Sequence, residues 1–141
     1  MSFYIIDIMY IGGHMTKELL YSIAYEDEGA YVRMHGVCTY KDVLEATISL
    51  WENPSFESIK YEIFDYLDVT EVNFSDYEVV ELAYRDNVAS RMTRRAKMAI
   101  VATHPDILEL SKVYRKTLPE SSFDFVVTDT PEAARIWVME K

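Results

Sequence analysis

The stretch KMAIVATHPDILELSKVYRKTL, residues 97–118, decides the fold class. Its first seven residues form a near-continuous apolar run, which is typical of a strand buried on both faces of a parallel sheet. A helix is predicted directly after it. Thr103 is the expected N-cap, Pro105 lies in the first turn, and Asp106 places a negative charge where the helix dipole favours one. A buried strand followed at once by a helix indicates the repeating unit of an α/β protein.

The residues just upstream continue this alternation. β-Branched and aromatic side chains predict a strand over residues 59–67. Residues 68–74 are expected to form a loop. A long helix is then predicted from Ser75 to about Arg95, because Ser75 and Glu78 have the spacing of a capping box.

Nearer the N-terminus, residues 19–25 and 30–35 predict an antiparallel hairpin, with Gly29 free to take a positive φ in the turn. A helix is expected to begin after Thr39 and to end before Pro54.

The C-terminal segment adds one more strand and one more helix. FDFVV, residues 123–127, predicts the strand, and Thr130 and Pro131 give the helix a cap and a first residue. The predicted order is therefore β-β-α-β-α-β-α-β-α. It implies a single α/β domain with a mostly parallel sheet of about five strands, right-handed crossovers and four helices.

The first residues are kept apart from this prediction. The apolar run in MSFYIIDIMYIGGHM is too short for a membrane span and lacks the features of a signal peptide. GGHM resembles a cloning remnant. We therefore treat residues 1–14 as an extension that is either non-native or an extra strand, and residues 15–141 as the domain.

Net charge and cysteine content indicate which partners and which cellular compartment to expect. The net charge of −10 disfavours nucleic acid and anionic membrane surfaces, and it favours a basic partner. The single cysteine, Cys38, is expected to be buried and unbridged, in a reducing cytoplasmic setting. We expect no cofactor and no metal, because the sequence has no Gly-rich phosphate loop, nucleophile elbow, metal-ligand spacing or dinucleotide fingerprint.

Three segments together resemble a known family. RMHGVCTYKDV, IFDYLDVTEVNFSDYEV and MAIVATHPDILEL are similar, in order and spacing, to the STAS fold of anti-sigma-factor antagonists, and more closely to its SpoIIAA-like branch. The resemblance covers about residues 15–141. It implies a SpoIIAA-like fold and regulation through protein–protein contact.

The resemblance also implies a switch that this chain lacks. Family members carry Phe-x-Asp-Ser-Ser-Gly at the start of this helix, and a partner kinase phosphorylates a serine there. Phe74 and Asp76 match the pattern, whereas Tyr77 and Glu78 stand at the two serine positions. Ser75 is then expected to be a helix cap. Glu78 could instead imitate a permanent phosphoserine.

The candidate sites follow from these placements. The candidate partner-binding residues are those of the expected loop and first helical turn: Asp68, Thr70, Glu71, Asn73, Phe74, Ser75, Asp76, Tyr77 and Glu78. Asp65 and His104 are expected with Asp68 at the carboxyl edge of the sheet, where α/β proteins bind ligands. Arg91, Arg94 and Arg95 form a candidate basic patch, which either compensates a helix C-terminus or docks an acidic partner.

Three functions remain open on the sequence. The leading one is a non-catalytic STAS-like regulatory module that contacts an unidentified protein. The second is a carrier or sensor for a small apolar, lipid-like ligand, and the third is an enzyme using Asp65, Asp68 and His104. The many tyrosines and methionines also suit a self-association face, so a homodimer is a further hypothesis.

Overall fold

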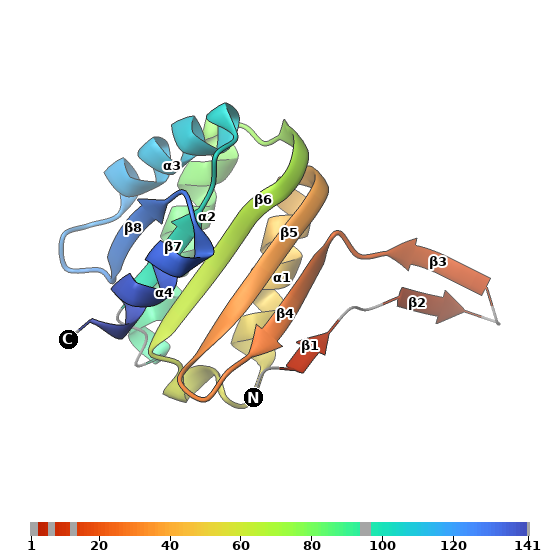
Figure 1. Ribbon diagram of the computed structural model, residues 1–141, viewed down its shortest axis with the longest axis horizontal. Helices are drawn as coiled ribbons and strands as arrows, with labels where there is room; N and C mark the ends of the chain where they lie inside the picture. The colour runs from red at the N-terminus through yellow and green to blue at the C-terminus, as the bar shows by residue number, and fades with distance from the viewer. Residues whose placement is uncertain (1–2, 6–7, 12–13, 94–96, 141) are drawn as a thin grey trace.

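A six-stranded sheet forms the centre of the computed structural model, which describes residues 3–5, 8–11, 14–93 and 97–140 (Figure 1). The strand order is β1-β4-β5-β6-β7-β8. The three pairs from β5 to β8 are parallel and the other two are antiparallel, which confirms the predicted mostly parallel sheet. Its strands are β1 (Phe3–Ile5), β4 (Tyr21–Tyr25), β5 (Gly29–Thr39), β6 (Tyr61–Asn73), β7 (Lys97–Val101) and β8 (Asp124–Thr128).

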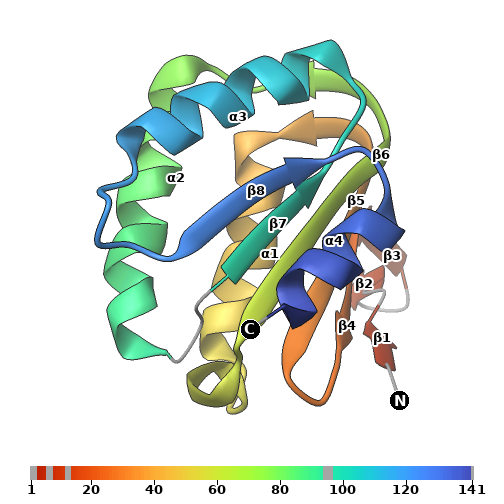
Figure 2. The same ribbon diagram turned by 60° about the vertical axis from the view of Figure 1, so that its left-hand side comes forward.

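The four predicted α-helices are confirmed, and they cover the two faces of the sheet unequally (Figure 2). Three of them pack on one face: α1 (Tyr40–Glu52), α2 (Asp76–Ala89) and α3 (Pro105–Thr117). The other face carries α4 (Pro131–Met139). Two short 3-10 helices follow α1 and α2, namely η1 (Phe56–Ser58) and η2 (Ser90–Met92).

Strand β7, which lies between β6 and β8, is buried on both faces, as its apolar run predicts. Met98 and Ile100 belong to the core under the three helices. Ala99 and Val101 belong to the core under α4. The alternation follows from the two-residue period of a strand.

The N-terminal residues that we kept out of the fold prediction contribute two features. β1 pairs with β4 and adds a strand to the five of the expected domain. β2 (Ile8–Ile11) pairs with β3 (His14–Glu18), which runs into the first residues of the expected domain, as a separate hairpin. This hairpin projects away from the main sheet (Figure 1).

Three of the predicted helix caps are confirmed. The side chains of Thr39, Ser75 and Thr130 accept hydrogen bonds from the first turns of α1, α2 and α4. The prediction for Thr103 is wrong, because His104 caps α3 and its Nδ1 accepts from the Asp106 N–H at 3.2 Å. The proline that follows His104 keeps this residue extended, so the helix can begin only after it.

Two other details differ from the prediction. The helix expected to reach about Arg95 ends as α2 at Ala89 and gives way to η2. Positive φ occurs at Gly36 (72°) and was wrongly predicted for Gly29. Gly29 is needed for space instead, since a Cβ there would collide with the Tyr61 ring.

Candidate partner-binding surface

The segment predicted as a loop is the second half of β6. The strand continues to Asn73 and stays paired with β5, ending at the register pair Thr39↔Asn73. Two register shifts accompany the extension, and at each of them β6 carries one residue more than β5; the second shift lies beside Gly36 of β5. The loop prediction is wrong because β6 accommodates two bulges, one of them beside the positive-φ Gly36 of β5, and stays paired with β5 to its end.

This extension presents polar side chains on a fixed backbone. Asp68, Thr70, Glu71 and Asn73 are all exposed. Val69 lies between them, is 7% exposed and belongs to the core under the three helices. The exposed side chains therefore project from a strand that is anchored in the core.

The start of α2 is fixed by the predicted capping box. Ser75 Oγ accepts from the Glu78 N–H at 3.2 Å, and Glu78 Oε1 accepts from the Ser75 N–H at 2.9 Å. Ser75 is therefore the cap of α2, and the Glu78 carboxylate is bound to the backbone beside it. Whether Glu78 imitates a phosphoserine for a partner stays a prediction.

Two aromatic residues flank this cap, and they differ in exposure. Phe74 is half-buried and meets the ring of Tyr40 edge-on, with centroids 5.4 Å apart. Tyr77 is 82% exposed. Phe74 ties the end of β6 to α1, while Tyr77 projects into solvent. We call the nine residues predicted above, from Asp68 to Glu78, the partner-binding surface.

The residues of the candidate ligand edge lie in different surroundings in the structure. Asp65 is 3% exposed and lies in the middle of β6, where it accepts hydrogen bonds from the Tyr31 hydroxyl and from the Leu67 N–H. Asp68 is exposed on the extension, and His104 caps α3. The three side chains thus bond to different neighbours or face solvent, so the expected constellation is not assembled. Over the described residues no group of three His, Cys, Asp or Glu side chains could hold a metal ion.

An apolar cavity lies between the sheet and the three helices. Its volume is about 50 Å³, and its lining includes Phe64, Tyr66, Met98, Tyr114 and Phe125. Pockets that enclose drug-sized ligands have volumes of roughly 300–1,000 Å³. The lining thus resembles that of a carrier, but the cavity could accept only a very small molecule without movement of the helices.

The candidate basic patch is described only in part. Arg91 is exposed on η2, whereas Arg94 and Arg95 lie outside the described residues. Lys97, the next basic residue that the structure describes, contacts α4 instead. Its Nζ donates to the backbone carbonyls of Trp137 at 2.9 Å and Glu140 at 2.5 Å, at the C-terminal end of α4, where the helix dipole favours a cation.

A polar network under α4 was missed by the sequence analysis. Arg135 of α4 donates two hydrogen bonds to Glu26, at 2.5 and 2.6 Å, and the Tyr61 hydroxyl donates a third at 2.5 Å. The Arg135 guanidinium also lies 4.9 Å from the centre of the Tyr31 ring. The hydrogen bond to Glu26 raises the pKa of Arg135, and burial raises those of Tyr31 and Tyr61. No local pattern could have revealed a pair separated by 109 residues.

Comparison with known proteins gives a likeness in structure alone. No family model matches the chain, and no curated protein matches it in sequence. A crystal structure of an uncharacterized protein of the DUF3478 family from Shewanella loihica PV-4, described as having a SpoIIAA-like fold, matches with a TM-score of 0.50 and 11% identity. The match covers 98% of this chain and 95% of that one. Within the described residues, no helix is long and apolar enough to cross a membrane. The chain therefore has a SpoIIAA-like fold.

Proposed function

We propose that this protein is a regulatory module that acts through protein–protein contact rather than catalysis, and without a phosphorylatable serine at the family position. The observation that carries the proposal is the construction of the partner-binding surface. Its backbone is held by pairing with β5 and by the Ser75–Glu78 capping box, while most of its side chains are exposed. A surface that is rigid before binding loses little conformational entropy when a partner docks.

The chemistry of this surface suggests a basic partner. Asp68, Glu71 and Asp76 are exposed carboxylates, and the net charge of the chain is −10. Such a field accelerates association with a positively charged protein and discriminates against an acidic one. Tyr77 adds an exposed aromatic ring, and tyrosine is enriched among the residues that dominate binding energy.

Affinity capture from cell extract, quantified by mass spectrometry, tests the proposal. The test variant carries Asp68→Lys and Glu71→Lys on the partner-binding surface. The matched control carries Glu109→Lys and Glu132→Lys, which change the net charge equally on exposed positions of α3 and α4. We expect proteins that are captured by the wild type and by the control to be lost from the test variant. If the test variant retains the same proteins, this surface is not the contact and the proposal fails.

The apolar lining of the cavity supports a second candidate function, the carriage of a small apolar ligand. Phe64, Tyr66 and Met98 give the cavity a wall that suits such a molecule. Its volume of about 50 Å³ requires either a very small ligand or a separation of the helices. Native mass spectrometry of the purified protein distinguishes this function, since a carrier should show an added ligand mass. A spectrum with only the mass of the chain counts against it.

A further inference from the structure

The outer side of α2 and η2 carries an apolar stripe. Its members, which we call the outer stripe, are Tyr77 (82% exposed), Tyr84 (64%), Val88 (59%) and Met92 (71%). Their spacing of seven, four and four residues places them on one side of a helix. The opposite side of α2 packs into the core through Val79, Leu82, Ala83, Asp86 and Ala89. α2 is therefore apolar on two opposite sides, and only one of them is covered within the described chain.

The charges beside the outer stripe change sign along its length. Asp76 and Glu78 lie at its beginning, and Arg91 lies at its end. Glu81 and Arg85 lie near the middle, where Arg85 Nη2 is 3.6 Å from Glu81 Oε1. A surface that is acidic at one end and basic at the other is complementary to a copy of itself in the reverse direction.

We propose that the outer stripe binds the outer stripe of a second copy of this chain, antiparallel, about a twofold axis beside Tyr84. Tyr77 precedes Tyr84 by seven residues and Met92 follows it by eight, so Tyr77 of each chain lies opposite Met92 of the other. Asp76 precedes Tyr84 by eight residues and Arg91 follows it by seven, which brings these opposite charges together. A twofold axis repeats both contacts, as in an isologous dimer.

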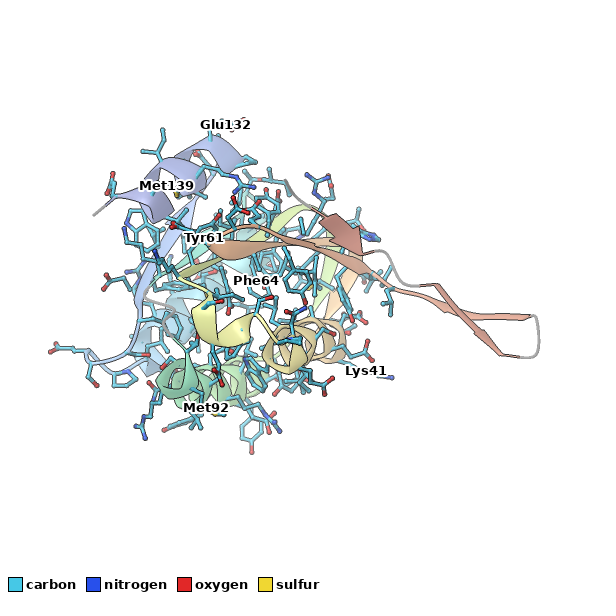
Figure 3. All side chains as sticks on the ribbon, turned by 90° about the horizontal axis from the view of Figure 1, so that it is seen from below. Lys41, Tyr61, Phe64, Met92, Glu132 and Met139 are labelled. Carbon is cyan, nitrogen blue, oxygen red and sulfur yellow. The ribbon has the colours of Figure 1, made fainter. Side chains whose placement is uncertain are left out.

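A groove beside the stripe supports this arrangement. It has a volume of about 480 Å³ and lies between the end of α1, η1 and the second half of α2, with Trp51, Phe56, Val88 and Met92 in its lining. Met92 lies at the outer edge of the molecule, away from Tyr61 and Phe64 at its centre (Figure 3). The Tyr77 ring of the second copy would therefore lie on the rim of an apolar groove. Aromatic side chains at the rim of such hollows are typical anchors of protein interfaces.

This dimer goes beyond the proposed function and shares Asp76 and Tyr77 with the partner-binding surface. Val88 and Met92 belong to the outer stripe alone, so a change there tests the dimer without altering the partner-binding surface. A Val88→Glu variant that loses the dimer and still captures partners would support the dimer independently of the proposed function, whereas a monomeric wild type that captures partners would overturn the dimer only. The Asp68→Lys, Glu71→Lys variant leaves the outer stripe unchanged. If it no longer captures partners, that result therefore concerns the partner-binding surface only.

Sedimentation velocity of the whole chain, from about 1 µM to 1 mM, measures the dissociation constant. We expect the wild type to dimerise within this range. Val88→Glu should raise the dissociation constant at least about tenfold, because it places a charge inside the contact, about one helical turn from the axis. Ile136→Glu on α4 is the matched control, since Ile136 is 67% exposed and lies on the opposite face of the sheet. Far-UV circular dichroism checks that each variant is folded.

A charge exchange tests the antiparallel register. Arg91→Glu should weaken the dimer, and adding Asp76→Lys to the same chain should restore it, because the pair is then present with its signs reversed. A wild type that stays monomeric up to the highest concentration overturns the proposal. So does an equal effect of Val88→Glu and Ile136→Glu, or a double variant that is no tighter than Arg91→Glu alone.

Discussion

On one face of the sheet three helices bury a large apolar cluster, whereas on the other face α4 alone covers a smaller one (Figure 2). The first face contains side chains such as Met34, Val43 and Leu50, which are at most 1% exposed. On the second face Ala134 and Val138 of α4 are buried, and the Glu26–Arg135 pair lies beside them. The first face is thus held mainly by apolar burial, with a buried hydrogen bond from Tyr114 to Asp86, and the second by a smaller apolar cluster together with the Arg135–Glu26 ion pair.

The difference reflects how much surface a single short helix can bury. α4 has nine residues, and its buried side chains are those of one alanine and one valine. Apolar burial contributes roughly 25 cal/mol per Å², so these two side chains contribute little. Paired hydrogen bonds between Arg135 and Glu26 add both stability and a defined position, because the planar guanidinium fits a carboxylate in one orientation.

The largest effect should come from a cavity in the three-helix face. Leu50 is fully buried in α1, so Leu50→Ala should lower the free energy of unfolding by about 2–5 kcal/mol. Val138→Ala on α4 removes two methyl groups from a side chain that is 8% exposed, and it should cost only about 1–2 kcal/mol. Urea unfolding monitored by circular dichroism measures both values.

The contrast between the two faces would be contradicted if Leu50→Ala and Val138→Ala lowered the free energy of unfolding by the same amount. Equal losses would mean that the α4 face depends on apolar burial as strongly as the three-helix face does. Ile136→Ala is the control, because it truncates an exposed side chain of the same helix. Ile136 is 67% exposed, so this substitution should change the free energy of unfolding by less than about 0.5 kcal/mol.

The polar network should give the next largest effect. The Glu26 side chain is 11% exposed and accepts from Arg135 and Tyr61, so Glu26→Ala should cost about 1–2 kcal/mol after allowance for the partial exposure of Arg135. Amide hydrogen exchange should accelerate in α4 more than in α1, because Glu26 bonds to Arg135 of α4 and to Tyr61 of β6.

Glu28→Ala is a matched control in the same turn. Glu28 pairs with Lys60 at 3.1 Å, but the two side chains are 51% and 59% exposed, so its removal should change stability by less than about 1 kcal/mol. A loss with Glu28→Ala as large as that with Glu26→Ala, or exchange in α4 that does not change, would contradict a special role for the network.

The sequence predicts the parts of this molecule whose signals are local. The apolar run of β7 and the capping pattern at Ser75 depend on residues close together in the chain, and both are confirmed. The parts that it does not predict depend on distant residues. The extension of β6 to Asn73 depends on its continued pairing with β5, past two bulges in β6, and Glu26 meets Arg135 only in the folded chain.

The candidate sites follow the same rule. The candidate residues from Asp68 to Glu78 lie close together in the chain, so they stay near one another although the segment is a strand rather than a loop. Asp65 and His104 are expected together because the predicted strand 59–67 ends just after Asp65 and His104 follows the next strand. Because β6 continues to Asn73, Asp65 lies well before its end and accepts a hydrogen bond from Tyr31. The outer stripe of α2 was missed because one helix there carries two apolar sides, which hides its periodicity.

The last effect is absent at neutral pH and appears only in alkaline solution, where it again separates the two faces. Burial raises the pKa of the Cys38 thiol, which lies in the core under the three helices, to about 12. The unfolded chain therefore loses this proton at lower pH than the folded chain. The contribution of Cys38 to stability is complete below the ordinary thiol pKa near 8.5 and is lost as the pH rises from there towards 12. One proton accounts for at most about 1.4 kcal/mol per pH unit.

Cys38→Ala isolates this contribution, because the buried tyrosines of both faces remain in the variant and titrate as before. We expect the variant to be less stable than the wild type at pH 7, where it lacks the buried sulfur. The difference in the free energy of unfolding between the two proteins should narrow between pH 8 and 10, because only the wild type loses stability through the ionisation of Cys38 in its unfolded state. Urea unfolding at each pH measures how steeply the free energy of unfolding of the wild type and of the variant changes with pH. Parallel slopes would mean that Cys38 is not desolvated in solution, and that alkaline loss of stability comes from the tyrosines, including Tyr31 and Tyr61 under α4.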